Sequence, residues 1–144
     1  MNRMTLVVLC AGFMILTGCK QTEGIRFVDQ SIEKLIERAQ RENKPILIYW
    51  TTGESCAPCV YMEKNILHLP EVGQYFNENF ICGSTGAGMY SPLKNSIKNN
   101  LIPKGFPTTF ILDSSGQLIG HIYGSVKTGE EYIREAEELL NRPQ

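Results

Sequence analysis

The chain has 144 residues, and its 14 Lys and Arg residues nearly balance its 15 Asp and Glu residues, for a formal net charge of −1 at pH 7. This balance, without any basic run, gives no indication of binding to nucleic acid or to an anionic membrane surface. The length suits one domain, and the sequence contains no internal repeat and no low-complexity segment.

The first eighteen residues are predicted to be a signal peptide. A short start with one positive charge, at Arg3, precedes an apolar run from Leu6 to Leu16. That run is shorter than the roughly 20 residues of a membrane span and suits an exported protein. It ends in Leu16-Thr17-Gly18-Cys19, which resembles the bacterial lipobox. The resemblance implies that Cys19 is lipidated and becomes the first mature residue; the alternative is an ordinary secretory signal with Cys19 incidental.

These signals divide the chain into a signal peptide at 1–18, a lipidated tether at 19–26 and a folded domain at 27–142. The lipid, rather than charge, would hold the protein to the membrane. We therefore expect it in the bacterial cell envelope, lipid-anchored and facing the periplasm. Disulfides form and persist in such exported compartments.

The domain begins with an expected helix whose apolar stripe is Ile32, Leu35, Ile36 and Ala39. The continuous apolar run Ile46–Trp50 predicts a strand that is covered on both faces. The later expected elements are a helix from Cys56 to about Leu67, a helical stretch Pro70–Phe76, a strand Phe80–Cys82, a helix from Ser91 to about Asn100, a hairpin of Thr109–Leu112 and Gln117–Tyr123, and a last helix opened by a Thr128-x-x-Glu131 capping box. This order predicts an α/β fold, a central mixed β-sheet flanked by helices on both faces.

The stretch Cys56-Ala57-Pro58-Cys59 carries the most specific chemical signal. Two cysteines at this spacing can close or reopen a small disulfide, and a helix N-terminus at Cys56 would favour the thiolate that attacks in disulfide exchange. Pro58 suits a first helical turn. The alternative is half of a structural zinc site, but the sequence offers only the scattered Cys82, His68 and His121 as further ligands.

The order of elements, with C-x-P-C after an early strand and Phe106-Pro107-Thr108 before a later one, resembles the thioredoxin superfamily over residues 27–142. It is similar to periplasmic thioredoxin-like domains such as the C-terminal domain of the transmembrane reductase DsbD. The resemblance implies an exposed attacking Cys56 and a buried resolving Cys59. It also implies a cis bond before Pro107, and a groove flanked by Phe106 and Thr108 in which the substrate chain pairs as an extended strand.

Two features depart from that family. The residue before the first cysteine is usually Trp but is Ser55 here, and Trp50, six residues before Cys56, is the aromatic candidate for substrate binding. Many relatives carry a buried Asp in the preceding strand, whereas Ile46–Trp50 contains no acid.

Glu63 is the candidate replacement for that acid. At about 100° per residue it lies in the middle of an apolar arc that contains Val60, Met62, Ile66 and Leu67. DsbD-type domains resemble this arrangement, with a glutamate seven residues after the first cysteine. Our hypothesis is that Glu63 accepts the proton of Cys59; the alternative is a partly exposed glutamate with no role.

The sequence thus predicts a membrane-anchored thiol–disulfide oxidoreductase without a cofactor beyond the Cys56–Cys59 disulfide, and with no metal. Its expected substrates are disulfide-bearing exported proteins, which it would reduce, and a transmembrane thiol reductase is the expected electron donor. The alternatives are a copper or zinc metallochaperone that uses Cys56, Cys59 and His68, and a binding module without turnover. Cys82 is expected to be buried and unpaired.

Overall fold

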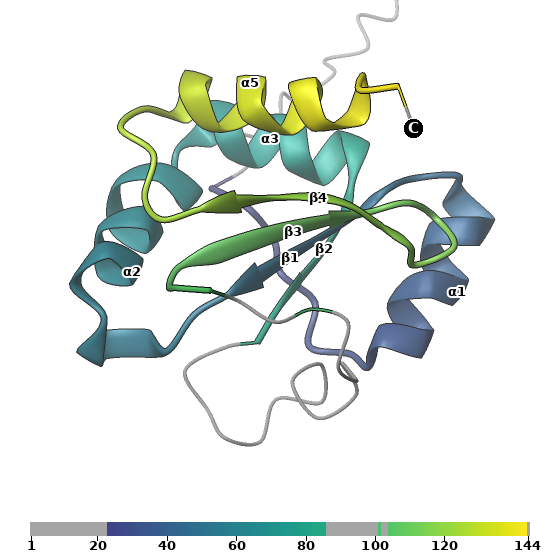
Figure 1. The fold of residues 1–144 in the computed structure, drawn as a ribbon, viewed down its shortest axis with the longest axis horizontal. Coiled ribbons are helices and arrows are strands. Elements are labelled where there is room, and N and C mark those ends of the chain that lie inside the picture. The colour runs from purple at the N-terminus through teal and green to yellow at the C-terminus, as the bar shows by residue number, and fades with distance from the viewer. Residues whose placement is uncertain (1–22, 86–100, 102–103, 144) are drawn as a thin grey trace, which may run out of the picture.

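The computed structural model describes residues 23–85, 101 and 104–143 (Figure 1). The predicted signal peptide, Cys19 and the helix expected at 91–100 lie outside the described residues. Within the described part of the chain, no helix is both long and apolar enough to cross a membrane.

A mixed four-stranded sheet forms the centre of the domain, in the order β2-β1-β3-β4. The strands are β1 (Ile46–Trp50), β2 (Ile81–Ser84), β3 (Thr108–Leu112) and β4 (Leu118–Tyr123). β1 runs parallel to β2 and antiparallel to β3, and β3 and β4 form an antiparallel hairpin. The prediction of a mixed sheet is therefore confirmed.

Helices cover both faces of this sheet, as expected (Figure 1). They are α1 (Ile32–Glu42), α2 (Ala57–Met62), α3 (Pro70–Asn79) and α5 (Gly129–Leu140), with a 3-10 turn η1 (Gly53–Ser55) before α2 and a π-helical turn η2 (Glu63–Leu67) after it. The expected single helix from Cys56 to Leu67 is thus correct in extent, but its second half is wound more loosely than an α-helix.

Alternation along β1 separates the core into two layers, because successive strand residues point to opposite faces. Leu47 and Tyr49 pack with α2, η2, α3 and α5 on one face. Ile46 and Ile48 pack with Leu35 of α1 on the other. A strand with apolar residues at every position can be buried only in this way, between two layers of helices.

The segment just before Val28 is packed onto the domain, although we predicted a tether as far as residue 26. The Ile25 N–H donates to the Leu67 carbonyl (2.8 Å) and the Val28 N–H to the Cys82 carbonyl (2.9 Å). The Gly24 carbonyl accepts from the Asn77 side chain (3.0 Å). Within the described residues, which start at 23, contacts with the domain are present from Gly24 onward.

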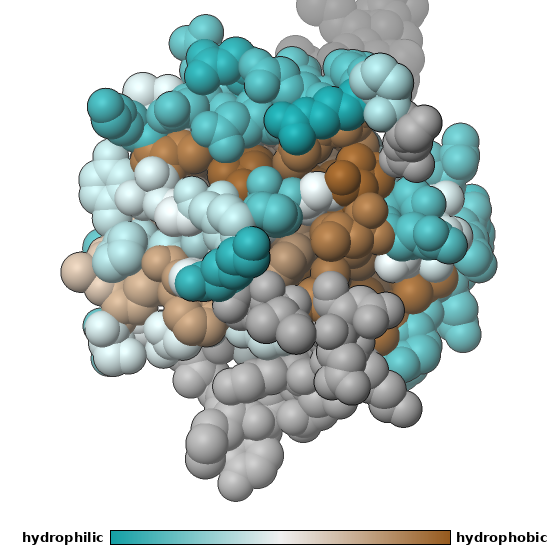
Figure 2. Space-filling view, viewed as in Figure 1, coloured by the Kyte–Doolittle hydropathy of each residue, from teal (hydrophilic) through white to brown (hydrophobic). Residues whose placement is uncertain are grey.

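The last helix starts at the predicted capping residue. The Thr128 hydroxyl oxygen accepts from the Glu131 N–H (3.1 Å). The Glu131 carboxylate accepts from the Lys127 N–H (2.7 Å), one residue before the partner of a standard capping box. Acidic and basic residues occupy the outer face of α5, so Figure 2 shows this helix as a hydrophilic band with hydrophobic residues beneath it.

Candidate active site

Cys56 and Cys59 form a disulfide at the start of α2, with their Cα atoms 5.2 Å apart. Cys56 is the N-cap residue, so its extended backbone leads directly into the helix, and Pro58 lies in the first turn as expected. The Cys59 N–H points at the Cys56 sulfur (3.2 Å). A thiolate at Cys56 would receive this N–H and the positive end of the helix dipole, which both favour the charged form.

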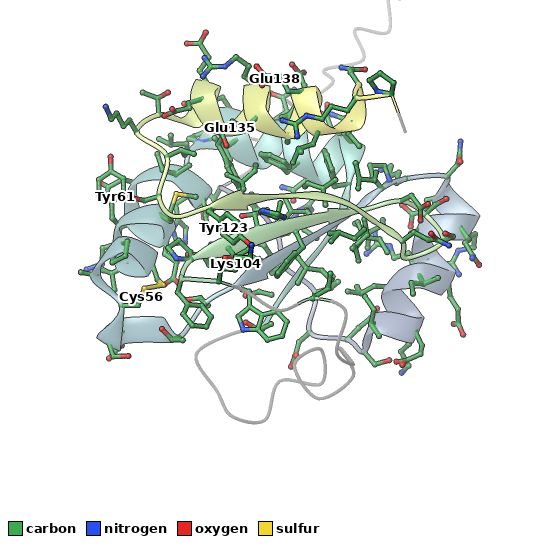
Figure 3. All side chains as sticks on the ribbon, viewed as in Figure 1. Cys56, Tyr61, Lys104, Tyr123, Glu135 and Glu138 are labelled. Atoms are coloured by element: carbon green, nitrogen blue, oxygen red, sulfur yellow. A yellow bond between two sulfur atoms is a disulfide. The ribbon has the colours of Figure 1, made fainter. Side chains whose placement is uncertain are left out.

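The two sulfur atoms differ in exposure. Cys59 is fully buried, whereas Cys56 is half-buried and follows an exposed turn residue, Ser55. Figure 3 shows Cys56 at the edge of the molecule where the chain enters α2. Cys56 is therefore the more accessible of the two cysteines, and Cys59 is protected inside the domain.

The loop before β3 has the expected backbone conformation. The peptide bond between Phe106 and Pro107 is cis. Pro107 and Thr108 are buried, and the Thr108 hydroxyl donates to the Gly105 carbonyl (2.6 Å). Phe106 is 37% exposed. Of these three predicted substrate-binding residues, Phe106 alone presents its side chain to solvent.

Trp50 lies on the face of the sheet opposite to Tyr49. Its ring packs edge-on against Phe110, with centroids 6.1 Å apart, beside the cluster under α1. Its backbone pairs with Thr108. Trp50 is thus next to the Pro107 loop through its main chain, while its half-buried side chain is engaged in the core.

Glu63 lies one helical turn after Cys59, and its N–H donates to the Cys59 carbonyl. Its carboxylate is partly buried and accepts a hydrogen bond from the Thr51 hydroxyl (3.3 Å). Met62, Ile66 and Leu67 of the predicted apolar arc are buried, and Val60 is half-buried. Side chains four apart on a helix are neighbours, so Glu63 is on the Cys59 side of α2, as predicted.

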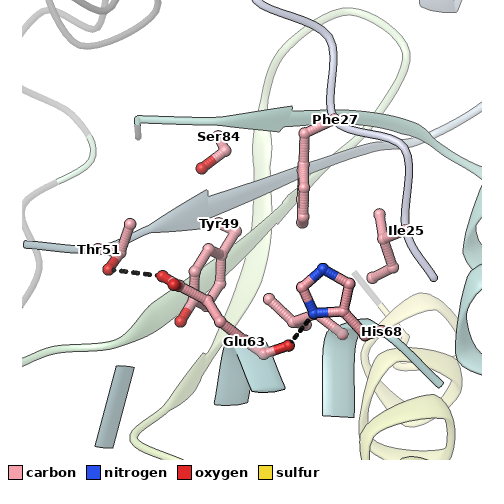
Figure 4. Close-up of a pocket in the computed structure, with 8 residues that line it drawn as sticks. Ile25, Phe27, Tyr49, Thr51, Glu63, His68 and Ser84 are labelled. Atoms are coloured by element: carbon pink, nitrogen blue, oxygen red, sulfur yellow. Dashed lines mark hydrogen bonds between the residues drawn. The ribbon is translucent and has the colours of Figure 1, made fainter. Parts of the chain in front are cut away.

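A pocket of about 280 Å³ opens beside this carboxylate (Figure 4). Its apolar walls come from the N-terminal segment and η2, and its polar walls from the ends of β1 and β2 and from η2 with the residue after it. The lining residues are Ile25, Phe27, Tyr49, Thr51, Glu63, Leu67, His68 and Ser84. Glu63 therefore has an open side toward solvent although its other contacts are within the domain.

Tyr49 and Thr51 also belong to this site, although no sequence pattern indicated them. Tyr49 is buried, and its hydroxyl donates to the Cys59 carbonyl (3.4 Å). Burial raises the pKa of Tyr49 further above its usual value, and the negative charge of Glu63 acts in the same direction. Alternation along β1 could have placed Tyr49 and Thr51 on one face, but Thr51 belongs to a stretch that we predicted to be a turn.

His68 also lines this pocket, although an α-helix continued from Cys59 would place His68 about half a turn away from that residue. It is exposed, but one ring nitrogen is hydrogen-bonded to the Glu63 carbonyl, and the ring lines the pocket. The π-helical turn changes the angular positions beyond Glu63, which explains the difference. Among the residues that the structure describes, no three His, Cys, Asp or Glu side chains are grouped in a way that could hold a metal ion.

Cys82, as predicted, is buried and carries a free thiol. Its sulfur lies 3.7 Å from the Phe76 carbonyl oxygen. Burial raises the pKa of Cys82 to about 12. It therefore stays neutral under conditions in which the exposed cysteine can react.

A family model described as thioredoxin-like matches residues 28–114, which is more than half of the chain. The chain belongs to the thioredoxin-like family. No curated protein matches the sequence.

Solved structures with the thioredoxin-like fold are similar to this domain. A proposed disulphide-isomerase from Bacteroides thetaiotaomicron is 22% identical, with a TM-score of 0.66 over 86% of this chain and 99% of that one. The DsbH oxidoreductase is 16% identical, with a TM-score of 0.64 over 85% and 89%. The oxidised C-terminal domain of DsbD from Neisseria meningitidis is 22% identical, with a TM-score of 0.56 over 77% and 98%. These likenesses establish the fold.

The thioredoxin-like fold, together with a C-x-P-C disulfide at a helix N-terminus, identifies the chain as a thiol–disulfide oxidoreductase. The chemistry needs one accessible sulfur, one protected sulfur and a helix that stabilises the thiolate, and all three are present.

Proposed function

We propose that this chain is a membrane-anchored reductase for disulfides of exported proteins, attached through a lipid on Cys19 and facing the periplasm of a bacterial cell envelope. The observation that carries the proposal is the Cys56–Cys59 disulfide, in which the first sulfur is accessible and the second is buried. Pro58 before the second cysteine matches reducing members of the superfamily that the sequence resembles, which favours reduction over oxidation.

The reaction starts from the reduced pair. The Cys56 thiolate attacks one sulfur of the substrate disulfide, that disulfide breaks, and the other substrate sulfur leaves as a thiolate. Cys59 then loses its proton and attacks the Cys56 sulfur, which releases the second substrate sulfur. Two electrons pass to the substrate, and the pair is left as the disulfide described above. A membrane thiol reductase is the proposed donor that returns the pair to the reduced form.

Glu63 is the proposed acceptor of the Cys59 proton. It follows Cys59 by one turn of helix, and its carboxylate borders the open pocket. A carboxylate at this place can take a proton from a buried thiol and exchange it with water. β1 contains no acid that could do so instead.

The proposed substrate groove lies along the loop at Phe106, Pro107 and Thr108. Backbone next to Pro107, on the Phe106 side before β3 begins, can pair with an extended substrate chain, and the exposed Phe106 ring would contact its side chains. Trp50, whose side chain packs under the sheet, would support this loop from beneath rather than touch the substrate.

Trapping of mixed disulfides tests the proposal. Cys59→Ser removes the resolving sulfur, so the variant should accumulate covalent adducts with periplasmic proteins that a thiol reductant releases. Cys56→Ser should accumulate almost none, and Cys82→Ala, the matched control in the core, should behave as the wild type. Equal adduct formation by the Cys56 and Cys59 variants, or failure of the wild type to catalyse insulin reduction by dithiothreitol, would contradict the assignment. Metal analysis of the same purified protein tests the metallochaperone alternative.

A further inference from the structure

Two hydroxyl side chains that the dithiol chemistry does not use lie around Glu63, and both come from the end of β1 (Figure 4). Thr51 is 6% exposed and Tyr49 is 1% exposed. A buried hydroxyl group needs a partner, so the contacts of these two side chains show what they hold in place.

Thr51 links Glu63 to the turn that carries Cys56. Its hydroxyl donates to the Glu63 carboxylate (3.3 Å) and accepts from the Gly53 N–H (3.0 Å). Because a hydroxyl has one hydrogen to donate, the Gly53 N–H orients that hydrogen toward Glu63. The Gly53 carbonyl in turn accepts from the Cys56 N–H (3.1 Å). A short chain of contacts therefore runs from the attacking cysteine to the carboxylate.

Tyr49 links the same carboxylate to Cys59. Its hydroxyl donates to the Cys59 carbonyl (3.4 Å), and its phenol is close enough to Glu63 and Thr51 to interact with both. The phenol stays protonated because burial raises its pKa, so it acts as a donor throughout the ordinary pH range. Tyr49 thus holds the main chain of the resolving cysteine beside the carboxylate.

The backbone that carries these hydroxyls is fixed. The Thr85 N–H donates to the Tyr49 carbonyl (3.1 Å), and the Thr51 N–H donates to the Thr85 hydroxyl oxygen (3.2 Å). Thr85 is fully buried at the end of β2. A hydroxyl on backbone that is fixed by such hydrogen bonds can hold the Glu63 carboxylate more firmly than a hydroxyl on a free loop.

Glu63 itself is held from three directions. Its N–H donates to Cys59, its carbonyl binds the His68 ring, and its carboxylate accepts from Thr51. The π-helical turn begins at this residue, and such turns are frequent at functional sites. Among the described residues, the ionisable side chains lining the pocket are Glu63, Tyr49 and His68.

We propose that Thr51 and Tyr49 are positioning residues for proton transfer: Thr51 orients the Glu63 carboxylate, Tyr49 holds Cys59 beside it, and the proton leaves through the pocket. In this step the Cys59 S–H bond breaks and the proton passes to Glu63. The Cys59 thiolate then attacks Cys56 and releases the substrate sulfur. The inference rests on the proposed function, because it concerns the resolving step of that reaction.

The test follows the two steps separately with 4,4′-dithiodipyridine. The reduced full chain, with Cys10 and Cys19 changed to Ser and kept in detergent, releases one pyridinethione when Cys56 attacks the reagent and a second when Cys59 resolves the adduct. The second phase is independent of reagent concentration, so it reports resolution alone. Its rate is measured over roughly pH 3.5–9.5, which spans the ordinary pKa values of carboxyl and thiol groups.

Thr51→Val removes the donor to the carboxylate. The carboxylate then loses the donor that holds it toward Cys59, so the second phase should slow several-fold. Thr51→Ser keeps the hydroxyl and should restore the wild-type profile. Thr52→Val, at the exposed neighbouring threonine, is the matched control and should leave the profile unchanged.

Tyr49→Phe keeps the ring and removes the donor to Cys59. We expect the second phase to slow by a factor of a few at all pH values, because the phenol acts on the position of Cys59. Thr51→Ala replaces Thr51→Val if the latter does not fold, and urea unfolding of each variant checks that the domain is intact.

Three results would overturn the inference, and they differ from one another. In the first, the pH profile of Thr51→Val coincides with that of the wild type while the profile of Glu63→Gln differs. Glu63 is then the proton acceptor, but Thr51 does not position it. Coincident profiles for both variants remove Glu63 and its positioning residues together. A wild type without a second phase contradicts the dithiol function itself.

Discussion

The hydroxyl groups of Thr109 and Tyr132 lie 2.8 Å apart in the core between β3 and α5. Both residues are buried, and neither hydroxyl has access to water. Each therefore satisfies the other, and the pair joins the centre of the sheet to the last helix. Loss of one hydroxyl should therefore lower the free energy of unfolding more than loss of both hydroxyls.

Tyr132→Phe should lower the free energy of unfolding by about 1–3 kcal/mol, because it leaves the Thr109 hydroxyl without a partner in the core. Thr109→Val should do the same to Tyr132. The double variant should lose less than the sum of the two single changes. Urea unfolding of the four proteins measures this, and strictly additive losses would show that the two hydroxyls are not coupled.

Gly73 in α3 should be intolerant of Ala, although Gly→Ala within a helix ordinarily stabilises by about 1 kcal/mol. A Cβ at Gly73 would lie 2.2 Å from the Gly24 carbonyl oxygen, which is backbone and cannot rotate away. Gly73→Ala should therefore displace the N-terminal segment and lower the unfolding free energy by about 1–3 kcal/mol.

Hydrogen exchange of the Ile25 and Val28 amides provides the local measurement, since both bind the domain through their N–H groups. Their protection should fall in Gly73→Ala. Gly105→Ala is the control, because a Cβ there meets nothing within 4 Å. Unchanged protection in Gly73→Ala would mean that α3 moves instead and the segment stays docked.

Cys82 should be alkylated far more slowly than Cys56 in the reduced native protein. Its pKa is raised by burial from the usual 9.0 to about 12, and the thiolate is the reactive form. Three pKa units correspond to roughly a thousandfold less thiolate at neutral pH. Iodoacetamide labelling followed by mass spectrometry measures both rates, and the Cys82 rate should approach that of Cys56 only in urea. Rapid labelling of native Cys82 would contradict its placement.

The same shift predicts how stability depends on pH. The folded-state pKa of Cys82 lies above that of the unfolded chain, so its contribution to stability is present below pH 9 and is lost between about pH 9 and 12. Cys82→Ala should remove that part of the alkaline loss. Urea unfolding of both proteins across this pH range measures the effect. A parallel loss of stability in the wild type and the variant would contradict the assignment of this loss to Cys82.

Periodic patterns predicted most of the fold because they report burial directly. The apolar run at Ile46–Trp50 could be buried at every position only as a strand between two layers. The stripe on α1 and the Thr128 cap likewise specified their helices locally. The C-x-P-C spacing predicted the disulfide because the chemistry requires that spacing.

The surroundings of Glu63 could not be predicted in the same way. Thr51 is held in the site by a hydrogen bond from its N–H to the Thr85 hydroxyl oxygen, at the end of another strand. A partner so distant in the sequence cannot be recognised from a local pattern. The position of His68 beside the pocket does not follow from an α-helical projection, because the helix is π-helical from Glu63 to Leu67. Tertiary contacts, rather than local preference, decide both positions.

Cys19→Ala tests the proposed anchor. Without the cysteine the chain cannot be lipidated, so the protein should appear in the soluble periplasmic fraction or remain unprocessed. Multiple acyl chains hold a protein firmly, whereas a single chain binds only marginally, so the wild type should resist extraction by salt. Cys10→Ala is the control within the predicted signal peptide and should leave the distribution unchanged. Membrane association equal to that of the wild type in Cys19→Ala protein whose signal peptide has been removed would show that the lipid is not the anchor.

Glu63→Gln separates the titration of this side chain from its shape. The amide can still accept the hydrogen bond from Thr51, so the fold around the pocket should be kept, but it cannot take a proton from Cys59. The resolving step should then slow by about 10²–10⁴-fold, the usual contribution of a general base, and lose the pH dependence that a carboxylate gives it. The attack by Cys56 should keep its wild-type rate, because that sulfur is stabilised by the start of α2 instead.

Glu54→Gln, at an exposed acid in the turn before the cysteines, is the matched control. Stopped-flow measurement of both phases in the three proteins decides the matter, and identical resolving profiles in wild type and Glu63→Gln would make Glu63 a structural residue.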